Sequence, residues 1–249
     1  VPVLIIRRRP EKAETEGKRK TGLVLTRLAG RKRNLWCLRS NVDAQPGFND
    51  QTDEEGNHGD RTGNHKHLKK PLLEIVVLGD GNIIIENTNI NHITPIISKL
   101  EEANCKLKLE KDKIELKAPK KLKALEIRTM PYPGFPTDMQ SIFVSMLTIA
   151  KGTSIIVENI FESRYKFTQE LIRMGAKITI EGKSAIVKGT RKLYGANVNA
   201  TDLRGGAALV LAGIVAKGET TIENIEYILR GYENLNKKLE NLGVNIKMV

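Results

Sequence analysis

A four-residue helix start occurs twice in the chain and is the strongest indication of its fold. Thr137-Asp138-Met139-Gln140 and Thr201-Asp202-Leu203-Arg204 each begin an apolar helical segment that ends in Ala-Lys-Gly. A β-type run ending in Glu-Asn follows each segment, as Ile156-Val157-Glu158-Asn159 and as Thr221-Ile222-Glu223-Asn224, and a third copy is Ile84-Ile85-Glu86-Asn87. Elements that recur in a fixed order indicate one supersecondary unit used several times. The sequence therefore predicts three related units.

Each unit is predicted to contain a strand, a helix, a hairpin and a second helix. The helices after the Glu-Asn runs are expected to end at Asn104, Gly175 and Gly243, which follow those runs by 17, 16 and 19 residues. Asn and Gly tolerate the left-handed conformation that closes a helix. The second helices, 139–150 and 203–216, are apolar enough to pack centrally. The expected fold is α/β, with sheets outside and helices within, and another segment must cover the edge of the incomplete third unit.

The chain is predicted to divide near residue 78. Residues 1–78 are basic and polar, with weak periodicity, and are expected to be largely disordered. The first 70 residues carry 16 Lys or Arg against 9 Asp or Glu, which is net +7 of the total of +12. Such an excess favours anionic partners. Residues 79–249 hold the repeated units and are predicted to form a partial domain.

Composition excludes several classes of protein. No stretch has the roughly 18 apolar residues of a membrane span. The N-terminus lacks the pattern of a signal peptide, and two distant cysteines give no disulfide framework, so a cytoplasmic location is expected. His65 and His67 could be read as metal ligands, but their spacing favours a solvated loop, so no metal site and no cofactor are predicted.

The candidate functional residues lie at the starts of predicted helices. Thr137 and Gln140 have the spacing of a capping box. Asp138 and Asp202 are acids in a first helical turn. An acid at this position stabilises the helix through its dipole, so neither residue needs a further role to explain its presence. Arg204 is different, because a cation is mildly unfavourable there and its guanidinium is therefore expected to have a function.

Two more arginines strengthen the prediction of an anion site. Arg164 and Arg230 follow the second and third Glu-Asn runs and are expected at helix starts. Guanidinium groups bind phosphate and carboxylate bidentately, and helix N-termini add backbone donors. Gly205 and Gly206 would let the backbone approach such a ligand. We expect Asp138 and the three arginines to converge on one positively charged pocket.

These motifs resemble those of a known family. The run from Thr129 to Gln140, TMPYPGFPTDMQ, is similar to the signature of the enolpyruvyl transferases that act on UDP-N-acetylglucosamine. Phe161-Glu162-Ser163-Arg164, Ala200-Thr201-Asp202-Leu203-Arg204 and Arg230-Gly231-Tyr232-Glu233-Asn234 match the same family in the same order. The resemblance runs from about residue 80 to the C-terminus.

The resemblance implies an inside-out α/β fold built from repeated βαββα units, with two such domains in the family and the active site between them. It implies transfer of the enolpyruvyl group of phosphoenolpyruvate to the 3-hydroxyl of UDP-N-acetylglucosamine, a step of peptidoglycan synthesis in the cytoplasm. By position, Asp138 would be the general base and Ile160 would line the sugar-nucleotide site through its backbone. Arg164 and Arg230 would hold phosphoenolpyruvate, with Asp202 and Arg204 completing the cluster.

The chain also departs from the family. It corresponds to roughly one of the two domains, and the family's reactive-cysteine loop finds no match. Leu229 replaces the acid usual before Arg230. We therefore expect a fragment that is inactive alone, whose missing N-terminal half could be supplied by another chain. Two alternatives remain open: a nucleic-acid-binding protein, suggested by the basic N-terminal segment but lacking a recognisable reading motif, and a non-catalytic repeat module in which Asp138 and the arginines only cap helices.

Overall fold

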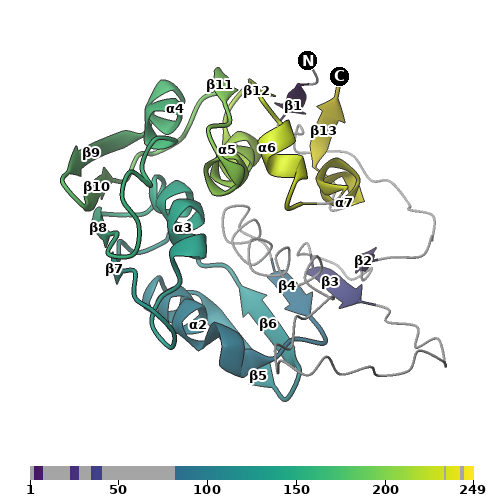
Figure 1. Cartoon of the computed structure of the whole chain (residues 1–249). Coiled ribbons are helices and arrows are strands. Elements are labelled where there is room, and N and C mark those ends of the chain that lie inside the picture. The colour runs from purple at the N-terminus through teal and green to yellow at the C-terminus, as the bar shows by residue number, and fades with distance from the viewer. Residues whose placement is uncertain (1–2, 8–22, 28–34, 41–81, 233, 242–243) are drawn as a thin grey trace, which may run out of the picture.

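The computed structural model describes residues 3–7, 23–27, 35–40, 82–232, 234–241 and 244–249, the second and third of these ranges by their backbone alone. These residues form three sheets, with helices packed among them (Figure 1). The first sheet has the order β2-β3-β4-β6-β5, from Leu23–Arg27, Leu35–Ser40, Asn82–Ile85, Lys113–Lys117 and Lys106–Glu110. The second has the order β7-β8-β10-β9, from Glu126–Arg128, Thr153–Val157, Ser184–Lys188 and Lys177–Glu181. The third has the order β11-β12-β1-β13, from Asn197–Asn199, Glu219–Glu223, Leu4–Arg7 and Asn245–Met248.

The helices follow the predicted plan. They are η1 and α2 (Ile90–Ile93, Thr94–Glu102), η2 and α3 (Thr137–Met139, Gln140–Leu147), α4 (Thr168–Arg173), α5 (Leu203–Val215), α6 (Glu226–Leu229) and α7 (Leu235–Asn241). None of the helices in the described part of the chain is long and apolar enough to cross a membrane.

The repeat in the sequence is a repeat in the sheets. In each sheet a parallel pair (β3 and β4, β7 and β8, or β11 and β12) is followed by two antiparallel strands. The sheets lie around the outside in Figure 1, and α3 and α5 lie side by side between them. The predicted mixed α/β architecture is confirmed.

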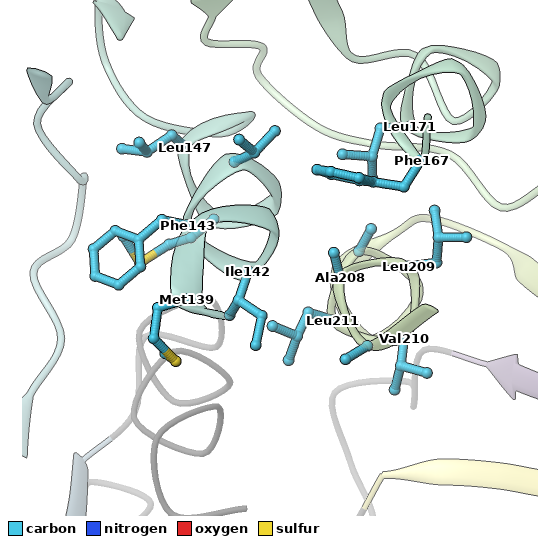
Figure 2. Close-up of a cluster of buried hydrophobic side chains, with 14 of the residues drawn as sticks. Met139, Ile142, Phe143, Leu147, Phe167, Leu171, Ala208, Leu209, Val210 and Leu211 are labelled. Carbon is cyan, nitrogen blue, oxygen red and sulfur yellow. The ribbon is translucent and has the colours of Figure 1, made fainter. Parts of the chain in front are cut away.

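The centre of the core is the contact between α3 and α5. All eight residues of α3 are buried, as are Gly205–Gly213 of α5. Figure 2 shows Ile142 and Leu211 between the two helices, with Phe167 and Leu171 close by. Ser141 Oγ donates to the backbone oxygen of Arg204 at 3.0 Å, and Ser145 Oγ donates to that of Ala208 at 2.8 Å. These two bonds fix which turn of α3 lies against which turn of α5.

The edge of the third unit is covered by the start of the chain. β1 pairs antiparallel with both β12 and β13, and so takes the place that β10 has in the second sheet. Leu4 and Ile6 alternate into the core at 4% and 0% exposure. The sequence predicts that some segment covers this edge, but it also predicts that residues 1–78 are largely disordered. A four-residue strand beside an arginine run gives no local sign that its pairing partners lie more than 200 residues away. Residues 41–78, with His65 and His67, lie outside the described residues.

The predicted helix stops are confirmed in two units, and the prediction of a single helix in the third unit is wrong. Asn104 and Gly175 have φ of 71° and 91°, as expected of left-handed helix stops, whereas Gly243 lies outside the described residues. The single helix expected after the third Glu-Asn run is divided into α6 and α7. Asn234, between them, has a φ of 52°, which a right-handed helix cannot contain.

Candidate functional site

The site begins where β7 and β8 end. These strands are parallel, so Thr129 and Glu158, which follow them directly, lie at the same edge of the sheet. Glu158 is only 1% exposed. Its Oε1 accepts from Thr129 Oγ1 at 2.8 Å and from the backbone N–H groups of Ile160 and Phe161 at 2.9 and 3.1 Å. Its Oε2 accepts from Thr137 Oγ1 at 2.8 Å. One carboxylate therefore joins the loop 129–137 to the loop 158–161.

Asp138 and Arg204 meet at the first turns of the two central helices. Arg204 Nε donates to Asp138 Oδ1 at 2.5 Å. The pair is partly exposed, with 44% of the Asp138 side chain and 33% of the Arg204 side chain open to solvent. The hydrogen bonds from Ser141 and Ser145 to the backbone of α5 fix the position of α5 along α3, so that the two first turns lie side by side. The structure thus brings together a carboxylate and a guanidinium that both remain accessible to a ligand.

Asp202 supports Arg204 through the backbone. It is the N-cap of α5, and its Oδ1 accepts from the N–H groups of Arg204 and Gly205 at 2.9 and 2.8 Å. These two donors are therefore occupied by the cap, and the expectation that they would be offered to an anion is corrected. The guanidinium of Arg204 is the anion-binding group at this position.

The glycines at the start of α5 allow close packing. A Cβ at Gly205 would lie 2.8 Å from Phe167 Cβ, and one at Gly206 would lie 2.5 Å from Ile228 Cγ1. A Cβ at Gly231 would lie 2.8 Å from Leu203 Cδ1 and Cδ2. The predicted role of Gly205 and Gly206 in ligand approach is replaced by a packing role. The start of α5 is consequently held between the segment before α4 and the end of α6.

Arg164 and Arg230 lie on these two flanking segments. The Arg164 guanidinium is 4.2 Å from the centroid of the Phe161 ring, and that of Arg230 is 5.6 Å from the centroid of the Tyr227 ring, both within cation–π range. Arg230 follows α6 at its C-terminal end, so its expected place at a helix start is wrong, because the third helix is broken there. The guanidinium groups of both arginines thus lie against aromatic rings, on segments that pack against the start of α5.

Three other residues singled out in the sequence have contacts that differ from those predicted. Thr137 and Gln140 form no capping box: Thr137 donates to Glu158, and Gln140 is buried at 1% exposure at the first turn of α3. Ile160 is 37% exposed, but its N–H is bound to Glu158. Only its side chain and backbone oxygen are left to line a ligand site.

Two functional candidates come from the structure alone. The sequence analysis treated Glu158 only as part of a strand end. The recurrence of Glu before Asn, at Glu86, Glu158 and Glu223, could have indicated that this glutamate has a structural role. Tyr165 is buried, and its hydroxyl donates to the backbone oxygens of Ile156 and Lys183 at 2.7 and 3.2 Å. Burial raises the pKa of this phenol. In the described ranges, no group of three or more His, Cys, Asp or Glu could hold a metal ion.

Comparison with known proteins places this geometry in one family. Residues 71–239 match the model of EPSP synthase (3-phosphoshikimate 1-carboxyvinyltransferase). A UDP-N-acetylglucosamine 1-carboxyvinyltransferase of Desulfofundulus thermocisternus is 52% identical over 166 residues, which are 67% of this chain and 68% of that protein. A relative with the same activity in its name, from Caldanaerobacter subterraneus subsp. tengcongensis, is 51% identical over 67% of this chain and 40% of its own length. The chain thus spans well under half of that second relative.

Solved structures agree on the fold. The enolpyruvyl transferase NikO from Streptomyces tendae superposes with a TM-score of 0.67 and 26% identity, over 74% of this chain and 44% of its own. An EPSP synthase from Acinetobacter baumannii gives a TM-score of 0.61 at 16% identity, over 74% of this chain and 47% of its own, which supports the fold alone. With most of its length matched by the family model and half of the matched residues shared with its relatives, the chain belongs to the EPSP synthase family of enolpyruvyl transferases.

Proposed function

We propose that this chain is the substrate-binding half of an enolpyruvyl transferase that acts on UDP-N-acetylglucosamine. In this reaction the 3-hydroxyl oxygen of the sugar forms a bond to C2 of the enolpyruvyl group. The bond from C2 to the phosphate oxygen breaks, phosphate leaves and the hydroxyl proton is lost. The observation that carries the proposal is the accessible contact between Asp138 and Arg204, in a chain that is about half identical to relatives with that name over the 166 residues matched.

The proposed roles follow from the chemistry of the side chains. Asp138 accepts the hydroxyl proton, since a carboxylate within hydrogen-bond reach of the sugar can serve as a general base. Arg204 holds the phosphate or carboxylate of phosphoenolpyruvate, and Arg164 and Arg230 move from their aromatic partners toward the same anion. Asp202 keeps the backbone of Arg204 in place. Ile160 lines the sugar-nucleotide side of the site.

The biological setting is part of the same proposal. The reaction commits UDP-N-acetylglucosamine to peptidoglycan synthesis, and we place the chain in the cytoplasm. The other wall of the cleft and the reactive-cysteine loop would come from a further segment or from another chain. This chain by itself would bind substrate without turning it over.

The test is a calorimetric titration with UDP-N-acetylglucosamine, run beside a phosphate-release assay with phosphoenolpyruvate. We expect one sugar nucleotide to bind per chain and no phosphate to be released. Absence of binding by the folded chain would contradict the proposal. Phosphate release at a rate that depends on the sugar nucleotide would support the reaction and refute the expected inactivity.

A further inference from the structure

The buried carboxylate of Glu158 is not used by the proposed reaction. It lies behind the site, at 1% exposure, and contacts neither Asp138 nor Arg204 in the hydrogen bonds described above. Burying a carboxylate is costly unless its oxygens are satisfied. Glu158 meets that requirement with four donors, taken from two loops that both reach the site.

Three of these four donors lie at or next to a residue of the proposed site. Thr137, which donates to Oε2, immediately precedes Asp138 in the same short 3₁₀ helix. Ile160, whose N–H donates to Oε1, is itself predicted to line the sugar-nucleotide site. Thr129 fixes the start of the loop, since its hydroxyl donates to Glu158 and also accepts from the N–H of Asn159 at 2.8 Å. A shift of the Glu158 carboxylate would therefore move both loops.

We infer that Glu158 is a positioning residue, which acts through Thr137 to hold Asp138 in reach of Arg204 and through the N–H groups of Ile160 and Phe161 to set the neighbouring loop. This inference deepens the proposed function and rests on it for the meaning of the site. The contact that it explains, Arg204 Nε to Asp138 Oδ1, is made between two side chains of this chain. The positioning role can therefore be measured separately from substrate binding.

The experiment uses the hydroxyl of Thr137, because that group connects Glu158 to Asp138. Thr137→Val removes the hydroxyl at constant shape, Thr137→Ala removes it without the added methyl group, and Thr137→Ser retains it. The matched control is Thr190→Val, since Thr190 is also half-buried and its hydroxyl donates to the backbone oxygen of Thr148 at 3.0 Å, away from the site. The readout is hydrogen exchange of the Arg204 Nε–H group by NMR, assigned through its loss in Arg204→Lys.

We expect the Arg204 Nε–H to exchange about tenfold faster in Thr137→Val and Thr137→Ala, as for the loss of one hydrogen bond to a charged group. Thr137→Ser and Thr190→Val should exchange at the wild-type rate, even where their melting temperatures fall. Wild-type exchange in folded Thr137→Val and Thr137→Ala would overturn the positioning role. So would an equal acceleration in Thr190→Val, because it would show a general loss of stability.

A second readout separates this inference from the proposed function. Titration with UDP-N-acetylglucosamine should give about tenfold weaker binding for Thr137→Val and unchanged binding for Thr190→Val. If the wild-type chain binds no sugar nucleotide, the proposed function fails, while the Arg204 signal still decides whether Glu158 positions Asp138.

Discussion

At the scale of single residues, Glu158 offers the largest expected effect on stability. Glu158→Ala removes the acceptor of four hydrogen bonds and leaves the buried hydroxyl of Thr129 without it. We expect the free energy of unfolding to fall by about 3 kcal/mol, as for other disrupted buried networks. Glu158→Gln should lose less, because the amide oxygen can still accept the three bonds at Oε1. Urea unfolding of the two variants checks both statements, and a Glu158→Ala chain within 1 kcal/mol (about the cost of one ordinary hydrogen bond) of the wild type would refute them.

Tyr165 should make the fold sensitive to alkali. Burial raises the pKa of its phenol, so the folded state favours the neutral form. The resulting stabilisation is complete below the unfolded pKa of about 10 and is lost as the pH rises through the folded pKa. We expect the free energy of unfolding to decrease between about pH 10 and pH 12, and to decrease less steeply in Tyr165→Phe. Equal slopes for the two proteins in urea titrations across that range would contradict this assignment.

Among the residues of the site, sequence reasoning located the pair but not its support. The repeat identified Asp138 and Arg204, and the pair does form across the central helices. The arginines on the flanking segments were also identified, but not their stacking on Phe161 and Tyr227. Glu158 was missed because its four donors come from residues up to 29 positions away, which only the parallel pairing of β7 and β8 brings together. A pattern in the chain shows a residue's type, whereas its hydrogen-bond partners depend on topology.

At the scale of elements, β1 should be required for the third unit. Ile6 is fully buried in β1 and contacts α5 near Gly213, whereas the adjacent Ile5 is half-buried. We expect Ile6→Ala to lower the free energy of unfolding by about 3 kcal/mol, and Ile5→Ala to lower it by about 1 kcal/mol. Urea unfolding measures the difference. Equal and small losses would show that the N-terminal strand does not hold the sheet in solution.

The start of α5 should tolerate no side chain at Gly206. Alanine favours a helix by about 1 kcal/mol over glycine, but a Cβ here would lie 2.5 Å from Ile228 Cγ1. We expect Gly206→Ala to lower the free energy of unfolding by about 1–2 kcal/mol, and with it the melting temperature. The cost of overpacking outweighs the higher helix propensity of alanine. Gly213→Ala is the control, because its nearest neighbour is the end of the Ile6 side chain at 3.1 Å. A stabilised Gly206→Ala chain would show that α6 moves aside easily.

Most elements could be predicted from the sequence, and the two exceptions have different causes. The hairpins and the stops at Asn104 and Gly175 depend on local spacing and on left-handed conformations, both of which the chain shows directly. The pairing of β1 with β12 and β13 depends on contacts across the whole chain. The break between α6 and α7 depends on a turn at Asn234, where apolar spacing alone continued the helix.

At the scale of the whole molecule, the three sheets and the two central helices form one repeated framework (Figure 1). The accessible pair of Asp138 and Arg204 lies where α3 and α5 begin. Longer relatives are matched over about 40% of their length. The proposed division of labour is that this part binds the sugar nucleotide and the rest of such a protein completes the cleft.

Whether Asp138 takes part in holding the substrate is tested most directly by calorimetry. The measurement compares the affinity for UDP-N-acetylglucosamine of the wild-type chain, Asp138→Asn and Asp112→Asn. Asp112 lies in the exposed turn between β5 and β6 and serves as the matched control. We expect one bound sugar nucleotide for the wild type and for Asp112→Asn, and binding at least about tenfold weaker for Asp138→Asn. Equal affinities for all three folded proteins would contradict this expectation, because Asp138 would then have no part in holding the substrate.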